Sequence, residues 1–254
     1  MGIGFYFNNF SQHSMMKQGL LLSLFLATLN PVFGQVLISL LLGDKLNSGK
    51  VEFGLDGGAN FSSMAGVPGS APATGFHLGF YFDIKTKHQW LFHTGVIVKS
   101  PLGAHGLPVY PLGNPDLDQA FQGGIVSRNL RCFNVPVMIR YPFRNHFYAE
   151  GGIILGLLYK AFDKFENDIN TSNDLSYTVN IKDQFHPLDV GLTAGLGYRL
   201  LRGNGMNLGI RYYYGVVDIV VDDNSPNVFN RSLYLAVGIP IGAGKARQRA
   251  EAGN

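Results

Sequence analysis

Charged residues that alternate with apolar residues are the feature of this sequence best suited to chemistry. One parity of several short segments carries five acids and five bases: Glu52, Asp56, Asp83, Glu150 and Asp189, and Lys99, Arg140, Lys160, Arg199 and Arg211. In a membrane, opposed charges of this kind form either a proton or ion path or a structural network that satisfies buried polar groups. We expect a structural network inside the fold, built from Glu52, Asp56, Arg140, Glu150, Asp189, Arg199 and Arg211.

Two histidines, His77 and His93, share the parity of these charges on neighbouring segments. No cysteine and no evident third ligand accompanies them, as a metal site would require. Within the segments, Thr94 is the only serine or threonine on the opposite, apolar parity, where an enzyme acting on lipid would need its nucleophile. The sequence therefore predicts a protein without enzymatic activity, cofactor or bound metal.

Two polar stretches carry oxygen ligands of the kind that calcium prefers. The first holds Asp222, Asp223 and Asn224, and the second holds Asp168, Asn170, Asn173 and Asp174. Neither matches the spacing of the twelve-residue calcium-binding loop. We expect both to be solvated loops.

The elements that position these residues follow a period of two, which indicates strands with two different faces. In LDVGLTAGLGYRL (188–200), every second residue from Leu188 onward, including Val190 and Leu192, is apolar or aromatic and forms one face. The residues between them, from Asp189 to Arg199, form a second face of mostly glycines and charged residues. A charge facing lipid at the bilayer midplane costs about 2 to 4 kcal/mol. No segment carries a charge on its apolar parity, so we expect lipid on that side and a packed, ion-paired lumen on the other.

Eight segments repeat this pattern, at 51–61, 76–83, 90–99, 132–141, 147–160, 188–200, 206–216 and 233–241. Short connections alternate with longer ones at 62–75, 100–131, 161–187 and 217–232. Short periplasmic turns and long extracellular loops are typical of bacterial outer-membrane barrels. The sequence therefore predicts an all-β fold, an eight-stranded antiparallel up-and-down transmembrane β-barrel, integral to the cell outer membrane, with both termini in the periplasm.

Aromatic residues on the apolar parity gather near both ends of the segments, as two interfacial girdles require. Trp90, Phe92, Tyr141, Phe147 and Tyr198 stand near the short turns, and Phe61, Phe76, Tyr159 and Tyr214 stand near the long loops. The alternative is a soluble lipocalin-like barrel, whose apolar face points inward. That fold would have to pack most of these rings into its core, so we favour the membrane barrel.

The two ends of the chain do not follow the alternating pattern of the segments. Residues 1–34 combine upstream residues with a charged, then apolar, stretch ending in a small-residue cleavage site, which predicts a cleaved signal peptide. We expect 35–50 to be a periplasmic or interfacial extension, 51–241 the barrel and 242–254 a polar tail. The net charge of +3 offers no basic stripe for nucleic acid.

Several stretches resemble the PorT-like outer-membrane β-barrel family of the Bacteroidetes group. They are FGLDGGANFS (53–62), NVPVMIRYPFRNHFYAEGGIILGLLYKA (134–161), and LDVGLTAGLGYRL together with GMNLGIRYYYGVVDI between 188 and 219. The resemblance spans about 51 to 241 and implies location and architecture more than mechanism. One member of that family is implicated in type IX protein secretion.

These observations lead to an expected function. We expect a monomeric, non-enzymatic barrel surrounded by outer-membrane lipid, structural or binding a partner through its extracellular loops or periplasmic face. The resemblance points to a partner in a secretion or envelope machine. A narrow transport pore and the soluble ligand-binding barrel remain the alternatives.

Overall fold

The computed structural model describes residues 46–241 apart from 49, 169–173, 204 and 223. The expected signal peptide, most of the extension and the polar tail lie outside these residues. The strands are β1 (Val51–Ala65), β2 (Ala71–Lys85), β3 (Leu91–Lys99), β4 (Pro101–Pro108), β5 (Ile125–Pro142), β6 (Phe147–Asp168), β7 (Asp174–Asn180), β8 (Leu188–Arg199), β9 (Asn207–Gly215) and β10 (Phe229–Pro240). Four short helical turns join them: η1 (Lys87–Gln89), α3 (Pro115–Ala120), η2 (Lys182–Gln184) and α4 (Leu200–Gly203).

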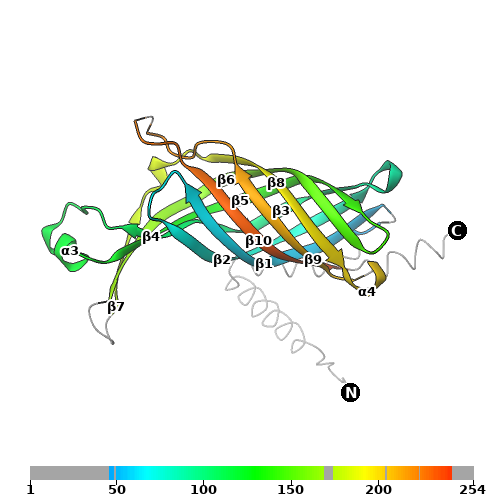
Figure 1. Ribbon diagram of the computed structural model, residues 1–254, viewed down its shortest axis with the longest axis horizontal. Coiled ribbons are helices and arrows are strands. Elements are labelled where there is room, and N and C mark those ends of the chain that lie inside the picture. Colours follow the sequence, from blue (N-terminus) through cyan, green and yellow to red (C-terminus); the bar gives the residue numbers. More distant parts are fainter. Residues whose placement is uncertain (1–45, 49, 169–173, 204, 223, 242–254) are drawn as a thin grey trace, which may run out of the picture. The chain divides into compact units, whose positions relative to one another are not determined.

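The ten strands form one antiparallel sheet that closes on itself, because β1 pairs with both β2 and β10 (Figure 1). β3 and β4 follow one another along β5, and β7 and β8 follow one another along β6. Each pair therefore occupies one position in the ring, which leaves eight positions. The predicted eight-stranded antiparallel barrel is confirmed.

The barrel has two different ends. The turn end carries the connections 86–90, 143–146 and 200–206, and the loop end carries 66–70, 109–124 and 216–228. In Figure 1, α3 and β7 mark the loop end and α4 marks the turn end. Among the described helices, none is long and apolar enough to span a membrane.

The expected long loops at 100–131 and 161–187 are wrong in large part. Residues 101–108 form β4, β5 begins at Ile125, β6 continues to Asp168, and 174–180 form β7. The glycines and prolines of 101–124 and the polar, acidic residues of 163–174 indicate loops locally. Strand pairing nevertheless satisfies the backbone groups of β4 and β7, and inward side chains of these segments share one apolar core. The expected strands at 132–141 and 147–160 therefore extend toward the loop end as β5 and β6, and two additional strands, β4 and β7, form there.

Two register shifts correct the expected position of two lysines. The β2–β3 ladder shifts between Leu78 and Gly79, and the β5–β6 ladder shifts between Arg131 and Cys132. One extra residue in a strand reverses which face the following side chains occupy. Lys99 and Lys160, both expected in the lumen, are consequently exposed.

Pro136 causes no bulge, contrary to what its place within a strand suggests. It pairs with Ile154 of β6 in unbroken register. On its other side, the β3–β5 ladder keeps one register from Leu91 to Ile97 and is interrupted only around Pro136. A proline without an N–H removes a ladder bond there, and the pairing with β6 continues on both sides of it.

The barrel interior divides into two parts. Toward the loop end it holds a cluster of buried apolar side chains: Met64, Leu102, Ala104, Leu107, Phe121, Val126, Leu130, Cys132, Leu158, Ala161, Phe165, Ile181, Phe185, Ile219 and Val228. Toward the turn end it holds most of the buried ion pairs. The expected ion-paired lumen thus fills one part of the interior, and a largely apolar core, which also encloses the Arg128–Asp163 ion pair, fills the other.

Candidate functional site

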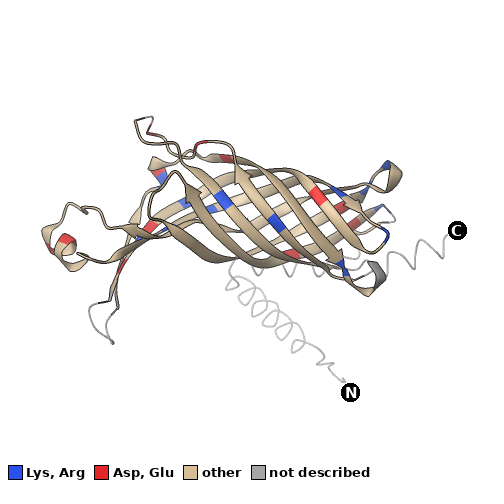
Figure 2. Ribbon diagram, viewed as in Figure 1, with Lys and Arg blue, Asp and Glu red and all other residues tan. Residues whose placement is uncertain are grey.

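The centre of the polar interior is a carboxylate between two arginines. Arg140 donates to Glu150 Oε2 from Nε at 3.0 Å and from Nη2 at 2.8 Å, and Arg211 Nε donates to Glu150 Oε1 at 2.8 Å. Arg140 Nη1 also donates to Asp83 Oδ2 at 2.7 Å. All four side chains are buried, and they come from β2, β5, β6 and β9, of which only β5 and β6 are neighbouring strands. Figure 2 shows acidic and basic positions on neighbouring strands of the barrel wall.

The other expected members of the charge network lie around this centre or apart from it. Arg211 Nη1 lies 3.7 Å from Asp56 Oδ2, and Arg199 forms an ion pair with Glu52 nearer the turn end. Asp189 stands apart, because its Oδ2 accepts from Asn230 Nδ2 at 2.8 Å and no arginine or lysine among the described residues forms an ion pair with it. Six of the expected residues thus form ion pairs, and Asp189 has an amide partner.

The two inward histidines are buried and contact acids. His93 Nδ1 lies 2.5 Å from Asp83 Oδ1, and His77 Nε2 lies 4.0 Å from Asp56 Oδ1. His93 stacks on Tyr81, and the edge of His77 meets Tyr234. Within the described parts of the chain, no group of three or more histidines, cysteines or acids is arranged to hold a metal ion.

Of the stretches considered for calcium, the structure describes only a part. Asp223, Asn170 and Asn173 lie outside the described residues. Asp222 accepts hydrogen bonds from the Asn224 backbone N–H at 3.1 Å and from Ser225 Oγ at 2.9 Å. These bonds hold the pKa of Asp222 below its usual range. The carboxylate thus closes a local turn, as aspartates in loops commonly do.

All nine residues of the expected aromatic girdles point away from the interior and are exposed or half-buried: Phe61, Phe76, Trp90, Phe92, Tyr141, Phe147, Tyr159, Tyr198 and Tyr214. Near the turn end, Trp90 packs on Tyr141 at 4.8 Å between ring centroids, and Phe147 on Tyr198 at 4.9 Å. Near the loop end, Tyr159 stacks on Phe133 at 4.6 Å. Cross-strand aromatic pairs of this kind suit the membrane–water interface.

A second buried ion pair, which the sequence does not predict, lies at the loop end. Arg128 donates to both carboxylate oxygens of Asp163, from Nε at 2.9 Å and from Nη2 at 2.7 Å, and Tyr110 Oη donates to Asp163 Oδ2 at 3.1 Å. Asp163 is completely buried. The sequence does not predict this pair because both residues fall in the expected loops, at 100–131 and 161–187. In the structure β5 and β6 extend through these stretches, and Arg128 and Asp163 are register partners that face inward.

Tyr110 gives this end of the molecule a dependence on alkaline pH. Burial, together with the neighbouring Asp163 carboxylate, raises the pKa of Tyr110 to about 12. An unfolded tyrosine titrates near about 10, so the folded protein keeps the phenol proton to higher pH. This contribution to stability is complete below about pH 10 and is lost as the pH rises through about 12. The difference in tyrosinate absorbance between the wild type and Tyr110→Phe should titrate near 12, and a midpoint near 10 would contradict the contact with Asp163.

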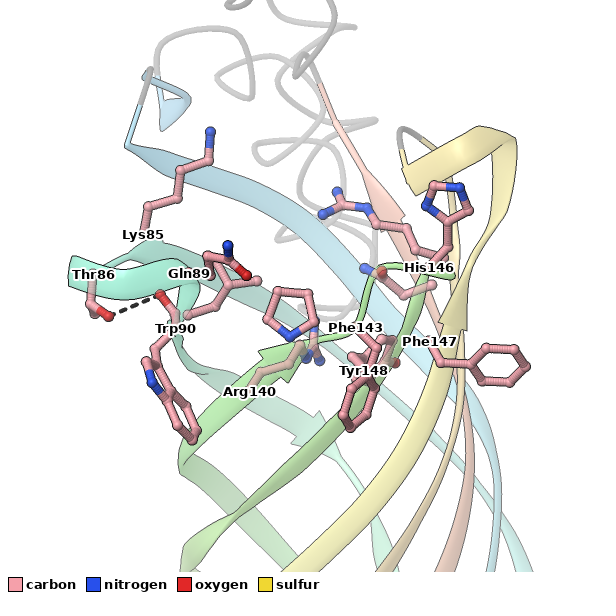
Figure 3. Close-up of a pocket in the computed structure, with 13 residues that line it drawn as sticks. Lys85, Thr86, Gln89, Trp90, Arg140, Phe143, His146, Phe147 and Tyr148 are labelled. Carbon is pink, nitrogen blue, oxygen red and sulfur yellow. Dashed lines mark hydrogen bonds between the residues drawn. The ribbon is translucent and has the colours of Figure 1, made fainter.

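The turn end contains a cavity of about 480 Å³. Its wall is made of Lys85, Thr86, Gln89, Trp90, Leu91, Arg140, Pro142, Phe143, His146, Phe147, Tyr148, Arg199 and Asn207 (Figure 3). Thr86 Oγ1 donates to the Trp90 carbonyl at 2.9 Å, which closes the turn on one side of the cavity. Arg140 therefore belongs both to the ion-paired centre and to the wall of an open cavity.

The family model that describes the outer membrane protein β-barrel domain matches residues 43–221, and the chain belongs to that family. It is an integral outer-membrane β-barrel protein.

Three similar solved structures are small outer-membrane proteins. The attachment invasion locus protein Ail of Yersinia pestis is 13% identical, covers 76% of this chain and 99% of its own, and has a TM-score of 0.41. Neisserial surface protein A is 15% identical, covers 75% and 96%, and has a TM-score of 0.38. OprG of Pseudomonas aeruginosa is 13% identical, covers 76% and 95%, and has a TM-score of 0.31. A search of the curated proteins found no match.

Proposed function

We propose that this protein is a non-enzymatic outer-membrane barrel that binds an extended segment of a partner protein along β7. The observation that carries the proposal is an open sheet edge at the loop end. Among the described strands, β7 pairs only with β6 and is the last strand of the sheet. An extended peptide can add to such an edge as a further strand.

The backbone groups available on β7 follow from its pairing. Ile181 N–H donates to the Ala161 carbonyl at 3.1 Å, in the same register as the β6–β7 ladder. Hydrogen-bonded pairs alternate along antiparallel strands, so Leu175, Tyr177 and Val179 direct their backbone groups toward β6. Ser176, Thr178 and Asn180 direct theirs toward the open side.

The composition of β7 differs from that of a protected edge strand. Edge strands are usually protected by charges, proline or bulges. β4, the other additional strand at the loop end, pairs with β5 on one side and with β2 at Ala104 and His105 on the other. The stretch Leu175–Val179 has neither a charge nor a proline, and its tyrosine, threonine and valine favour strands. β7 is therefore the edge suited to accept a partner.

The side chains beside this edge define what the partner segment would contact. Ser176, Tyr177 and Thr178 are exposed, whereas Leu175 and Val179 pack against the apolar core. On β6, Lys164 Nζ donates to Glu166 Oε1 at 2.5 Å; this bond, with that from Ser127, holds the pKa of Glu166 below its usual range. A segment that alternates apolar and polar residues would match this edge.

The partner class proposed here is another envelope protein, and the resemblance to the PorT-like group favours a component of a secretion machine. The apolar core inside the loop end argues against the alternative of a narrow transport pore, because an aqueous path needs a polar lining. The exposed apolar parity of the strands argues against a soluble lipocalin-like barrel.

The binding test uses one position of β7. Thr178→Pro removes an outward N–H without touching the β6–β7 ladder, whereas Thr178→Ala removes the side chain and keeps the N–H. Twelve-residue peptides selected by display on the purified barrel should bind Thr178→Ala as they bind the wild type. They should bind Thr178→Pro about tenfold or more weakly, since a main-chain hydrogen bond and the close approach are lost. Peptides that bind all three proteins equally would place the binding site elsewhere.

The proposal also requires the loop end to face the outside of the cell. The chain's single cysteine, Cys132, is buried, so an introduced cysteine can be labelled selectively. In intact cells a membrane-impermeant maleimide should label Ser176→Cys and should label Thr86→Cys, at the turn end, only after the outer membrane is permeabilised. The reverse order of labelling would show the opposite orientation.

A further inference from the structure

We propose that the cavity of about 480 Å³ at the turn end binds a neutral sugar. Its volume falls within the range of about 300 to 1,000 Å³ that is typical of small-molecule sites. The site lies at the opposite end of the molecule from the β7 edge and does not depend on the function proposed for that edge. Its evidence is a buried donor and a buried acceptor side by side in the wall, with aromatic side chains around the same cavity.

The two arginines in the wall do not require an anionic ligand. Arg140 is paired with Glu150 and Asp83. Arg199 is paired with Glu52. Because their charges are balanced within the protein, these arginines offer a ligand hydrogen bonds rather than uncompensated charge.

A donor and an acceptor in the wall have no hydrogen-bond partner among the described residues. Arg199 Nε is a buried N–H donor, and Asn207 Oδ1 is a buried acceptor. The Asn207 residue is 4% exposed, and its Nδ2 donates to Tyr81 Oη at 3.3 Å. Unpaired groups of this kind are costly in a protein interior, so a ligand that pairs both of them would bind favourably.

The strand register places the donor and the acceptor beside each other. Arg199 of β8 and Asn207 of β9 are register partners, and both line the cavity. Residues directly opposite on one face of an antiparallel pair have Cβ atoms about 4.5 to 5.5 Å apart. A hydroxyl both accepts and donates, so one hydroxyl can accept from Arg199 Nε and donate to Asn207 Oδ1. An ionised carboxylate has no proton for the second bond, which favours a hydroxyl ligand over an acidic one.

The rest of the wall suits the carbon face of a sugar ring. Trp90, Phe143 and Tyr148 line the cavity together with the polar side chains of Gln89 and His146 (Figure 3). The C–H groups on one face of a sugar ring are slightly positive and suit the negative face of an aromatic ring. Apolar and aromatic walls with a few polar groups are how small-molecule sites orient a ligand. The cavity thus offers apolar contact to one face of a ring and hydrogen bonds to its hydroxyls.

The experiment uses the fluorescence of Trp90, which is the single tryptophan of the chain and lines the cavity. The purified barrel, in a detergent without a sugar headgroup, is titrated with the neutral disaccharide N,N′-diacetylchitobiose. We expect a change in emission that saturates, and the absence of a saturable change would overturn the proposal.

Glycerol and inorganic phosphate are titrated in parallel with the disaccharide, and we expect a weaker response to each. An equal response to glycerol would mean that the cavity takes hydroxyls without recognising a sugar ring. An equal response to phosphate would show an anion site. Either result contradicts the sugar proposal.

A matched pair of asparagines tests the buried acceptor. Asn207→Leu keeps a branched side chain, removes the acceptor and should weaken disaccharide binding about tenfold. Asn134 is also a buried asparagine, 2% exposed and with an unpaired amide Nδ2, but it lies outside the wall. Asn134→Leu should therefore bind the disaccharide as the wild type does, and the heat-dependent gel shift shows whether both variants fold. Equal weakening by the two substitutions would contradict the site.

A second matched pair leaves the buried groups unchanged. His146 and His88 both have left-handed backbone, with φ of 68° and 60°, which glycine adopts readily. Only His146 lines the cavity, so His146→Gly should weaken disaccharide binding about threefold and His88→Gly should not. The proposal is wrong if these two variants bind the disaccharide alike.

Discussion

Arg140→Gln should destabilise the barrel by about 3 to 5 kcal/mol, because it leaves buried carboxylates without their cation. Arg140 is 4% exposed and donates to both Glu150 and Asp83. Its guanidinium carbon also lies 4.2 Å from the centre of the Tyr148 ring. The measurement is urea unfolding in lipid vesicles, followed by the mobility of unboiled samples on a gel, since folded barrels migrate differently from unfolded ones.

The matched control is Arg131→Gln on the same strand. Arg131 is exposed beyond the register shift, and its guanidinium carbon lies 5.2 Å from the centre of the Phe162 ring. An exposed cation–π contact contributes about 1 kcal/mol or less, so this variant should unfold near the wild-type urea concentration. Equal destabilisation by the two substitutions would mean that the Arg140 ion pairs contribute nothing specific.

The sequence predicts the barrel because lipid and lumen impose opposite demands on alternate residues. Along 188–200 that alternation is uninterrupted, and the structure forms β8 over Leu188–Arg199. The pattern is less informative where a strand leaves the bilayer. In β6 the parity reverses at the register shift after Leu158, so Lys160 becomes outward and Phe165 becomes inward. A bulge leaves no signal in composition, and the reversal is visible only in the pairing with β5.

The polar interior is partly predictable for the same reason. Inward parity alone selects Arg140, Glu150 and Arg211 as candidates for one network. Their actual contacts depend on which strands are neighbours and in which register they pair. Gly195 of β8 is the register partner of Glu150 on one side and of Arg211 on the other. Because Gly195 has no side chain, it leaves space for Glu150: a Cβ there would lie 3.0 Å from Glu150 Oε1. Asp189 shares the same parity but lies too near the loop end to meet an arginine of the centre.

The two parts of the interior have different consequences for function. Buried ion pairs connect β2, β5, β6 and β9 across the barrel and stabilise its closed form. The apolar core at the loop end instead joins β4, β5, β6 and β7 to the connections around them. The β7 edge proposed to bind a partner is thus held by hydrophobic packing rather than by the barrel ladder alone. Loss of that packing should disturb the edge and spare the barrel.

Phe165→Ala tests this division of the interior. Phe165 is completely buried, and its ring meets Tyr110 at 4.9 Å and Phe121 at 5.8 Å between centroids. Truncating such a phenylalanine costs about 3 to 5 kcal/mol, so proteolysis of the loop end under native conditions should accelerate by about a hundredfold or more. Its register partner Tyr177, which is 42% exposed, supplies the control, and Tyr177→Ala should accelerate cleavage only slightly. The heat-dependent gel shift should persist in both variants, because the ion-paired part of the barrel is unchanged. If Phe165→Ala abolishes the shift, the two parts unfold as one unit, and the β7 edge cannot move independently of the barrel.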